Sequence, residues 1–219
     1  MPPPKNAPRR LAVEGTDDKW SIVNLLAQHG TDWDRNPGLP FVHVHEGVSR
    51  LLTELPTALK SLERFGVVLD ADDDLGRRWA QLIDRAKEAD IGLPPAPAPD
   101  GTVVHLPDGR RFGVWLMPDN TLPGKLEDFL KHLVPVGDPV WEHAGTATTD
   151  AIGRRATLRQ VDHIKGQLHA WLAWQEQPGV PFGTALTNRT LRHDAEIAGR
   201  FVAWFWRVFG DVPSPITFA

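Results

Sequence analysis

Apolar runs and amphipathic stretches alternate along the first two-thirds of the chain. Three of the runs have the length and apolar content of buried strands and end in acidic or turn-forming residues. They are LAVEG (11–15), FVHVHEG (41–47) and RFGVVLDADDD (64–74). Further along, HLPDGRRFG (105–113) has the composition of a hairpin turn and leads into another strand, VWLMPDN (114–120). The pattern therefore predicts several short strands separated by helices.

The intervening stretches repeat apolar residues at helical spacing. Helices are predicted over TDDKWSIVNLLAQHG, which Thr16 can cap, and over VSRLLTELPTALKSL, which Pro56 should interrupt. GRRWAQLIDRAKEADIG forms a third helix that Gly92 ends, and LPPAPAPDG (93–101) is a stiff linker or surface loop. KLEDFLKHLV (125–134) is predicted to form a short amphipathic helix.

Strands that alternate with helices favour an α/β fold, in which helices cover both faces of a parallel sheet. From about residue 146 the pattern changes to two helical stretches, 157–176 and 190–209. The second has one apolar face that should dock on the core, formed by Ile197, Phe201, Trp204, Phe205 and Val208. The predicted organisation is a flexible tail (1–9), an α/β domain (10–145) and a helical C-terminal extension (146–219) packed on the core.

Composition narrows the classes of function. Lys and Arg number 24 against 28 Asp and Glu, a net charge of −4, so contact with nucleic acid would need a local basic patch. Cysteine is absent, which removes disulfides and thiolate metal sites and fits a reducing compartment. The opening MPPPKNAPRR does not resemble a signal peptide, and no apolar run reaches membrane-spanning length. We therefore expect a cytoplasmic protein without membrane contact.

Acidic side chains follow three of the predicted strands. Glu14, Asp70 and Asp119 each come directly after an apolar strand core. In open parallel sheets, binding sites lie beyond the carboxyl ends of the strands, so these acids should meet at one edge. If the chain stays extended past Asp70, Asp72 points to the same side and Asp73 to the opposite one.

Two helices add further candidate acids. On a helical wheel Asp18 lies one turn before Ile22 on the buried face, whereas Asp17 points away. Glu127 flanks the apolar stripe of its helix, while Asp128 lies nearly opposite. Carboxylates that meet in this way suit a hard cation such as Mg²⁺. For Asp17, Asp73 and Asp128 we favour the simpler interpretation of solvated surface acids.

The motif VEGTDD followed by VVLDADDD resembles the TOPRIM domain of topoisomerases, primases, the overcoming-lysogenization-defect (OLD) nucleases and the ribonuclease that matures 5S ribosomal RNA. The resemblance covers about residues 10–133. The longer frame, with LMPDN, PGKLEDFL and HAWLAWQE, looks like small stand-alone TOPRIM-like proteins, some of them related to OLD-type, ATPase-linked defence nucleases. The resemblance to TOPRIM domains implies a Rossmann-like sheet of about four parallel strands whose acids bind Mg²⁺, with Mn²⁺ as an alternative.

The resemblance also implies roles for particular residues. Glu14 matches the family's glutamate, Asp70 and Asp72 match its D-x-D, and Asp18 matches a metal-binding acid of the nuclease members. With two further candidates, the implied metal ligands are Glu14, Asp18, Asp70, Asp72, Asp74 and Glu127. Glu14 and Asp70 are also the expected catalytic residues, together with Lys165, which could assist the reacting phosphate as a lysine does in some related nucleases.

The absence of two residue types, tyrosine and cysteine, excludes some of the reactions that TOPRIM proteins catalyse. Topoisomerases of this family cleave with a tyrosine nucleophile, and the chain contains no tyrosine. Primases usually carry a cysteine zinc module, which is also missing. Metal-dependent hydrolysis of a phosphodiester remains, so the predicted function is that of a TOPRIM-type nuclease acting on DNA or RNA.

The best local basic patch lies in IGRRATLRQVDHIKGQLHA (152–170). Arg154, Arg155, Arg159 and Lys165 could follow a nucleic-acid backbone, although a solvated helix surface explains them equally well. A second cluster is predicted on the strand FVHVHEG. His43 and His45 face one way there and could bind Zn²⁺ with Glu46 nearby, but a surface edge is the more ordinary interpretation.

Two other functions fit the same residues. The chain could be a non-catalytic or conditional TOPRIM-like subunit that an ATPase partner activates, and the net charge of −4 favours this alternative over a free-standing nuclease. It could also be a small-nucleotide phosphohydrolase that uses the same metal chemistry. A homodimer is compatible with each of these functions.

Overall fold

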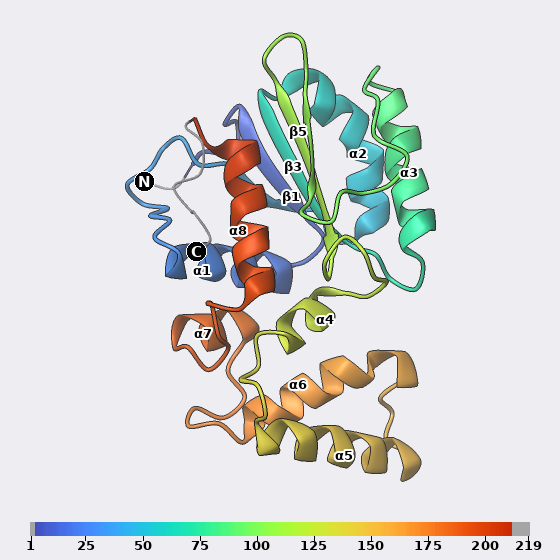
Figure 1. Cartoon of the computed structure of the whole chain (residues 1–219), viewed down its shortest axis with the longest axis vertical. Helices are drawn as coiled ribbons and strands as arrows, with labels where there is room; N and C mark the ends of the chain where they lie inside the picture. The colour runs from blue at the N-terminus through green and yellow to red at the C-terminus, as the bar shows by residue number, and fades with distance from the viewer. Residues whose placement is uncertain (1–2, 212–219) are drawn as a thin grey trace.

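The computed structural model describes residues 3–211 and has a mixed α/β architecture (Figure 1). Its five-stranded sheet has the order β2-β1-β3-β5-β4. The strands are β1 (Arg9–Val13), β2 (Phe41–Val44), β3 (Arg64–Asp70), β4 (Thr102–His105) and β5 (Arg111–Met117). β2, β1, β3 and β5 run parallel, and only β4 pairs antiparallel, through the hairpin with β5. The predicted parallel α/β sheet is confirmed, with one antiparallel edge strand added.

Helices flank this sheet and extend beyond it. They are α1 (Thr16–Gln28), α2 (Val48–Ser61), α3 (Leu75–Lys87), α4 (Leu126–Lys131), α5 (Pro139–Gly153), α6 (His163–Ala173), α7 (Phe182–Thr187) and α8 (Glu196–Phe209). A short 3₁₀ turn (Gln160–Asp162) precedes α6. No helix within residues 3–211 is long and apolar enough to cross a membrane.

The sheet separates two apolar layers, as the alternation of side chains along each strand requires. Leu11 and Val13 of β1 face one way and pack with α1 and α8, whereas Ala12 faces the other way and packs with α2 and α3. The same division is visible in the ribbon, where α8 crosses one face and α2 and α3 cover the other (Figure 1). Both faces of the sheet are therefore buried, which explains the nearly continuous apolar sequence of β3 and β5.

Helix α8, the last described helix, lies directly on the central strands. Gly66 of β3 and Gly113 of β5 are register partners, and together they leave a shallow depression in the sheet. A Cβ atom on Gly66 would lie 2.9 Å from the ring of Phe209, and one on Gly113 would overlap Val208. The apolar face predicted for the second C-terminal stretch is confirmed as a core face, with Phe201, Trp204, Phe205 and Val208 fully buried in it.

A helical hairpin of α5 and α6 projects beyond the sheet and rejoins it through α4 and α7 (Figure 1). The side chain of Asp138 caps α5 and also accepts a hydrogen bond from Trp171 Nε1 on α6, at 3.2 Å. The sequence pattern did not predict α5, because its buried positions are small residues such as Ala144 and Thr148. The stretch predicted over 157–176 forms α6 only from His163, and the stretch over 190–209 forms α8 only from Glu196.

Two expectations about the helices facing the other side of the sheet were wrong. Helix α2 continues through Pro56, because leucines on both sides of the proline, among them Leu55 and Leu59, are buried against the sheet. Helix α3 ends at Lys87 rather than near Gly92. Asp90 takes the left-handed conformation (φ 59°) and the amide of Ile91 bonds back to the carbonyl of Ala86, which closes the helix five residues earlier.

The boundaries predicted between the tail, the α/β domain and the C-terminal extension do not coincide with those of the structure. Arg9, expected in the tail, already belongs to β1, and Ala7 is buried. Residues 1–2 of that tail, and residues 212–219 of the predicted extension, lie outside the described part of the chain. Helix α5 spans the expected boundary at 145/146, and α8 supplies the core on one face of the sheet.

Candidate functional site

A cleft of about 350 Å³ opens where β1 and β3 end. Its walls come from four segments far apart in the sequence: the start of α1, the end of β3, the start of α4 and the region around α6. The lining residues are Gly15, Thr16, Asp17, Asp18, Asp70, Lys125, Leu126, Glu127, Asp162 and Lys165. The cleft thus lies at the carboxyl edge of a parallel sheet, where such folds place their ligands.

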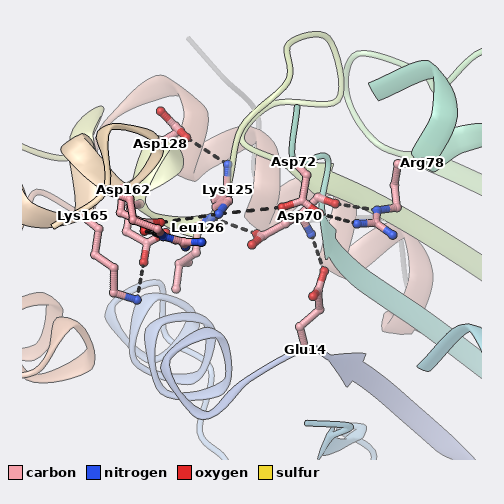
Figure 2. Close-up of polar contacts among 11 residues, drawn as sticks. Glu14, Asp70, Asp72, Arg78, Lys125, Leu126, Asp128, Asp162 and Lys165 are labelled. Carbon is pink, nitrogen blue, oxygen red and sulfur yellow. Dashed lines mark hydrogen bonds and ion pairs between the residues drawn. The ribbon is translucent and has the colours of Figure 1, made fainter. Parts of the chain in front are cut away.

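Glu14 and Asp70 connect the elements that form this edge (Figure 2). The Oε1 atom of Glu14, directly after β1, accepts a hydrogen bond from the backbone amide of Asp70 at 2.8 Å. The Oδ1 atom of Asp70 in turn accepts one from the amide of Leu126, at the start of α4, at 2.9 Å. The two carboxylates therefore fix the ends of β1 and β3 and the start of α4 relative to one another.

Asp18 approaches the same place from the first turn of α1. Its Oδ2 atom accepts a hydrogen bond from the amide of Gly15 at 3.1 Å, which closes the start of the helix. Only 8% of its surface is exposed. Burial, the charge of Glu14 and that of Glu127 raise the pKa of Asp18 to about 7. The helical wheel correctly placed Asp18 on the buried face.

Burial and mutual repulsion also disfavour the charged forms of the other two carboxylates. The pKa of Asp70 is raised to about 8, first by desolvation and then by the charges of Asp18, Glu14 and Glu127. Desolvation likewise raises the pKa of Glu14, although the amide of Asp70 and the charge of Arg78 act in the opposite direction. The cleft consequently concentrates more negative charge than its surroundings neutralise.

Asp72 is oriented differently from Asp70. β3 ends at Asp70, and Asp72 has a left-handed backbone (φ 53°) whose amide bonds to the carbonyl of Gly124. Its carboxylate pairs with Arg78 at 2.5 Å and lies 3.9 Å from Lys125 (Figure 2). The extended geometry assumed for Asp70 and Asp72 was wrong, because the chain turns between them; Asp72 borders the cleft and does not line it.

Cations alternate with the acids on the opposite wall. Lys165 of α6 forms an ion pair with Glu127 of α4 at 3.0 Å, and Lys125 lies 3.8 Å from Asp162 (Figure 2). Desolvation acts to lower the pKa of Lys165, but the hydrogen bond and charge of Glu127 outweigh it, so the pKa is raised and the amine stays charged. The contact between α4 and α6 thus brings Glu127 and Lys165 together.

Four other acids named from the sequence occupy different places. Asp74 caps α3, accepting a hydrogen bond from the amide of Arg77 at 2.9 Å, and it does not line the cleft. Asp119 closes its own turn with the amides of Thr121 and Leu122. Asp128 caps α4 through the amide of Lys125. Asp17, expected on the surface, is exposed but lines the cleft.

The basic stretch divides into a part at the cleft and a part away from it. Lys165 lines the cleft, and Arg159 lies next to it through an ion pair with Asp162 at 2.7 Å. Arg154 pairs with Asp150 on its own helix, and Arg155 is exposed in the following turn. The four residues therefore do not form one unpaired basic surface.

A comparison with family models finds a match over residues 8–210 to the family described as "Protein of unknown function (DUF3226)". The chain belongs to the DUF3226 family. The match runs from the start of β1 to the end of α8, so the sheet and the C-terminal helices belong to the same family unit. No curated protein and no solved structure matches the chain.

Three charged residues of this DUF3226 site were not identified from the sequence as site residues. Arg78 lies on the buried stripe of α3 with Trp79 and Leu82, and an arginine on an apolar stripe was a signal that could have identified it. Lys125 opens the segment that carries Glu127, but a lysine before a helix is ordinary. Asp162 gave no signal, because only the packing of α6 on α4 brings it near Lys125.

The donor chemistry of the cleft fits a hard cation, because carboxylate oxygens are the ligands that Mg²⁺ and Mn²⁺ prefer. Glu14, Asp18, Asp70 and Glu127 could supply these oxygens. Within residues 3–211, a set of three ligand atoms all within 4.8 Å of one another occurs at His43, His45 and Glu54, and the acids of the cleft do not form such a set. Binding of a cation in the cleft would therefore require side-chain rotations that bring the carboxylates together.

Proposed function

We propose that this DUF3226 protein is a TOPRIM-type, divalent-metal-dependent phosphodiesterase that acts on nucleic acid. One observation carries the proposal: carboxylates of α1, β3 and α4 line a single cleft together with Lys165, and Glu14, directly after β1, lies beside the cleft and accepts a hydrogen bond from the amide of Asp70. The parallel pairing of β1 with β3 supports it, because Glu14 and Asp70 follow these two strands, and the TOPRIM pattern likewise has a glutamate after the first strand and a D-x-D after a later one.

Each acid has a role that follows from its position. Glu14, Asp18, Asp70 and Glu127 would hold the cation, and Asp72 would orient the site through Arg78. The resident Mg²⁺ would supply charge neutralisation and an activated water for phosphodiester hydrolysis. Glu14 and Asp70 would hold the cation in their charged forms, so its uptake would release the protons that their raised pKa values favour in the metal-free site.

Lysine and arginine side chains would position the phosphates. Lys165 lies across the cleft from Asp70 and would contact the scissile phosphate once Glu127 turns toward the cation. Arg159 stands at the outer edge beside Asp162 and is suited to the neighbouring phosphate. Arg154 and Arg155 lie further along the helical hairpin and would contact the backbone beyond the cleft.

The test is cleavage of plasmid DNA, single-stranded DNA and structured RNA by the full chain, with Mg²⁺ or Mn²⁺ and with a chelator. We expect Glu14→Gln and Asp70→Asn to lower the cleavage rate by about 100-fold or more, because loss of an outer partner of a metal ligand already costs 10–100-fold. Asp84→Asn is the matched control, since Asp84 is an exposed acid of α3 outside the cleft. Cleavage that survives Glu14→Gln, or that needs no metal, would refute the proposal.

The alternative of a conditional subunit of an ATPase-linked complex is favoured by one feature of the cleft. Lys125, Lys165 and Arg78 are all engaged with acids of the site, so phosphate binding requires a rearrangement of the ion pairs. A partner ATPase that separates α6 from α4 would supply it. Under this alternative the purified chain is inactive with every substrate and metal. Cleavage then begins when a co-purifying ATPase and ATP are added, and Glu14→Gln abolishes it.

A further inference from the structure

A second group of potential metal ligands lies at the edge strand β2, outside the acidic cleft. It is on the side of the sheet that α2 covers, opposite the apolar layer formed by α1 and α8. His43 of β2 and His45, directly after it, project from the same face of the strand, and their rings are 4.2 Å apart between centroids. The amide of His45 bonds to the carbonyl of Val13, so the sheet pairing continues through this residue and fixes its direction. Glu54 reaches the same place from α2.

Three of the four imidazole nitrogens of this group are buried and have no hydrogen-bond partner among the described residues. His45 is 4% exposed, and neither its Nδ1 nor its Nε2 has a hydrogen-bond partner among the described residues. The Nδ1 atom of His43 is likewise buried without a hydrogen-bond partner among the described residues. Buried polar atoms without partners are uncommon in native proteins and are costly, so these nitrogens require an explanation that ordinary core packing does not give.

One distance between ligand atoms, that from His45 to Glu54, matches tetrahedral coordination, and the other two are at most 4.8 Å. His45 Nδ1 and Glu54 Oε2 are 3.4 Å apart without forming a hydrogen bond, and the three ligand atoms all lie within 4.8 Å of one another. Zinc–nitrogen and zinc–oxygen bonds of about 2.0–2.2 Å at a tetrahedral angle place two ligand atoms roughly 3.3–3.5 Å apart. The second oxygen of Glu54 accepts a hydrogen bond from Arg50, the kind of outer contact that orients a ligating carboxylate.

We propose that His43, His45 and Glu54 bind a borderline transition-metal ion such as Zn²⁺, with a fourth coordination position that opens to the adjoining cavity. That cavity has a volume of about 480 Å³, and its walls include His45, Glu54 and Thr57. Two imidazoles and one carboxylate with an open position form the donor set of several zinc sites that bind water or a substrate. The mixed nitrogen and oxygen donors distinguish this site from the all-carboxylate cleft.

The protonation state of the histidines agrees with this assignment. Metal binding needs neutral imidazole, and burial together with neighbouring positive charge lowers the pKa of both rings, that of His45 to about 4. For His43 the neighbouring cations are Arg10, Arg50 and Lys5. For His45 the charge of His43 acts first, followed by Arg10 and Arg50, and Glu54 opposes these charges at both rings. The charge of the arginines and the lysine opposes the uptake of a cation, so we expect modest affinity and not the very tight binding of a thiolate site.

Zn²⁺ alone is the probe for the experiment. The full chain, stripped with a chelator and dialysed, is titrated with Zn²⁺ by calorimetry, and we expect one ion per chain at this site. Glu54→Gln and His43→Ala should each weaken binding more than tenfold. Glu46→Gln is the matched control, because Glu46 is exposed on the neighbouring turn, pairs with Arg50 and is absent from the cluster. It should bind Zn²⁺ as the unmodified chain does.

Asp70→Asn separates this site from the acidic cleft, with which it shares no residue. We expect Asp70→Asn to leave unchanged the Zn²⁺-binding step that Glu54→Gln weakens, whatever its effect on cation binding in the cleft or on nucleic-acid cleavage. The absence of Zn²⁺ binding would overturn the proposal. So would binding that persists in Glu54→Gln and is lost in Asp70→Asn, because the ion would then lie in the acidic cleft. Circular dichroism of the metal-free variants checks their folding, and if His43→Ala does not fold, Glu54→Gln against Glu46→Gln decides alone.

Discussion

Asp70 and Asp18 occupy positions where burial and neighbouring carboxylates both penalise the ionised form. Each carboxylate accepts one hydrogen bond from a backbone amide, Asp70 from Leu126 and Asp18 from Gly15. These two bonds offset the cost of burying the charge only in part. Natural proteins retain such an arrangement where it serves binding or catalysis, because for stability alone an amide or an apolar residue would be better. The cost should be measurable in the metal-free protein.

We predict that the metal-free protein becomes less stable as the pH rises from 5 to 8. The pKa of Asp70 is about 8 and that of Asp18 about 7, both above the ordinary value of 3.8, so the folded state binds more protons than the unfolded state in this window. The stability present below the unfolded pKa is therefore lost as the pH rises through the folded values. Each pKa unit is worth about 1.4 kcal/mol, and Asp70 alone titrates across about three units of this window, so we expect a loss of several kcal/mol in urea unfolding with a chelator.

Asp70→Asn provides the control for this pH dependence. Asparagine can still accept the hydrogen bond from Leu126 but cannot ionise, so the variant should lose much of the decline in stability between pH 5 and 8. Mg²⁺ added at pH 8 should stabilise the unmodified protein and have a smaller effect on the variant. If the two proteins lose stability in parallel, the titrating groups lie elsewhere.

At the level of elements, the position of α8 depends on two small residues in the sheet. Gly66 and Gly113 face each other across β3 and β5, and α8 approaches through the space that their missing side chains leave. Trp204 adds a polar contact, because its Nε1 donates a hydrogen bond to the carbonyl of Thr102 on β4 at 3.2 Å. The helix is thereby fixed both along and across the sheet.

We expect Gly113→Ala to lower the free energy of unfolding by about 1–3 kcal/mol, the usual cost of an extra group forced into a packed core. The new Cβ would overlap Val208, and α8 would have to shift away from β5. The measurement is urea unfolding followed by tryptophan fluorescence. Gly92→Ala is the control, because a Cβ there meets nothing within 4 Å, and it should change the stability by less than about 0.5 kcal/mol. Equal effects of the two substitutions would contradict this account of α8.

At the scale of the whole molecule, the last described helix covers one face of the sheet that begins with the first strand. β1 begins at Arg9 and α8 ends at Phe209, yet both belong to one apolar layer. Arg9 and Arg64 also pair with Asp211, which joins the two ends of the described chain at the same edge. The C-terminal helices are therefore part of the same folding unit as the α/β region.

A fragment that ends at residue 145 should accordingly fail to fold cooperatively. It lacks α8, whose side chains Phe201, Trp204 and Phe205 are fully buried against the sheet and α1. We expect a weak near-ultraviolet circular dichroism spectrum and no sharp thermal transition. As a control, a Gly-Ser loop of equal length in place of the mostly exposed segment 154–159 should leave the transition nearly unchanged. A fragment that unfolds like the full chain would mean that residues 10–145 form an independent domain.

Local sequence patterns determined the four parallel strands, most of the helices on the sheet and the position of Glu14, Asp18 and Asp70 at its carboxyl edge, whereas β4 was not predicted. Apolar periodicity and strand order are properties of neighbouring residues, and the carboxyl edge of a parallel sheet follows from them. Asp72 shows where this reasoning stops. Its left-handed conformation depends on pairing with Gly124, fifty residues away, and no local pattern contains that contact.

Tertiary structure decided the remaining features, because each depends on residues brought together from distant parts of the chain. Packing of α6 on α4 paired Lys165 with Glu127, and burial of α3 turned Arg78 toward Asp72. The turn after β2 directed Glu46, the ligand expected from the sequence, to the surface. The packing of α2 placed Glu54 beside His45 instead. The sequence by itself determined which residues can bind a cation; only the packed fold selects which of them lie within reach of the same one.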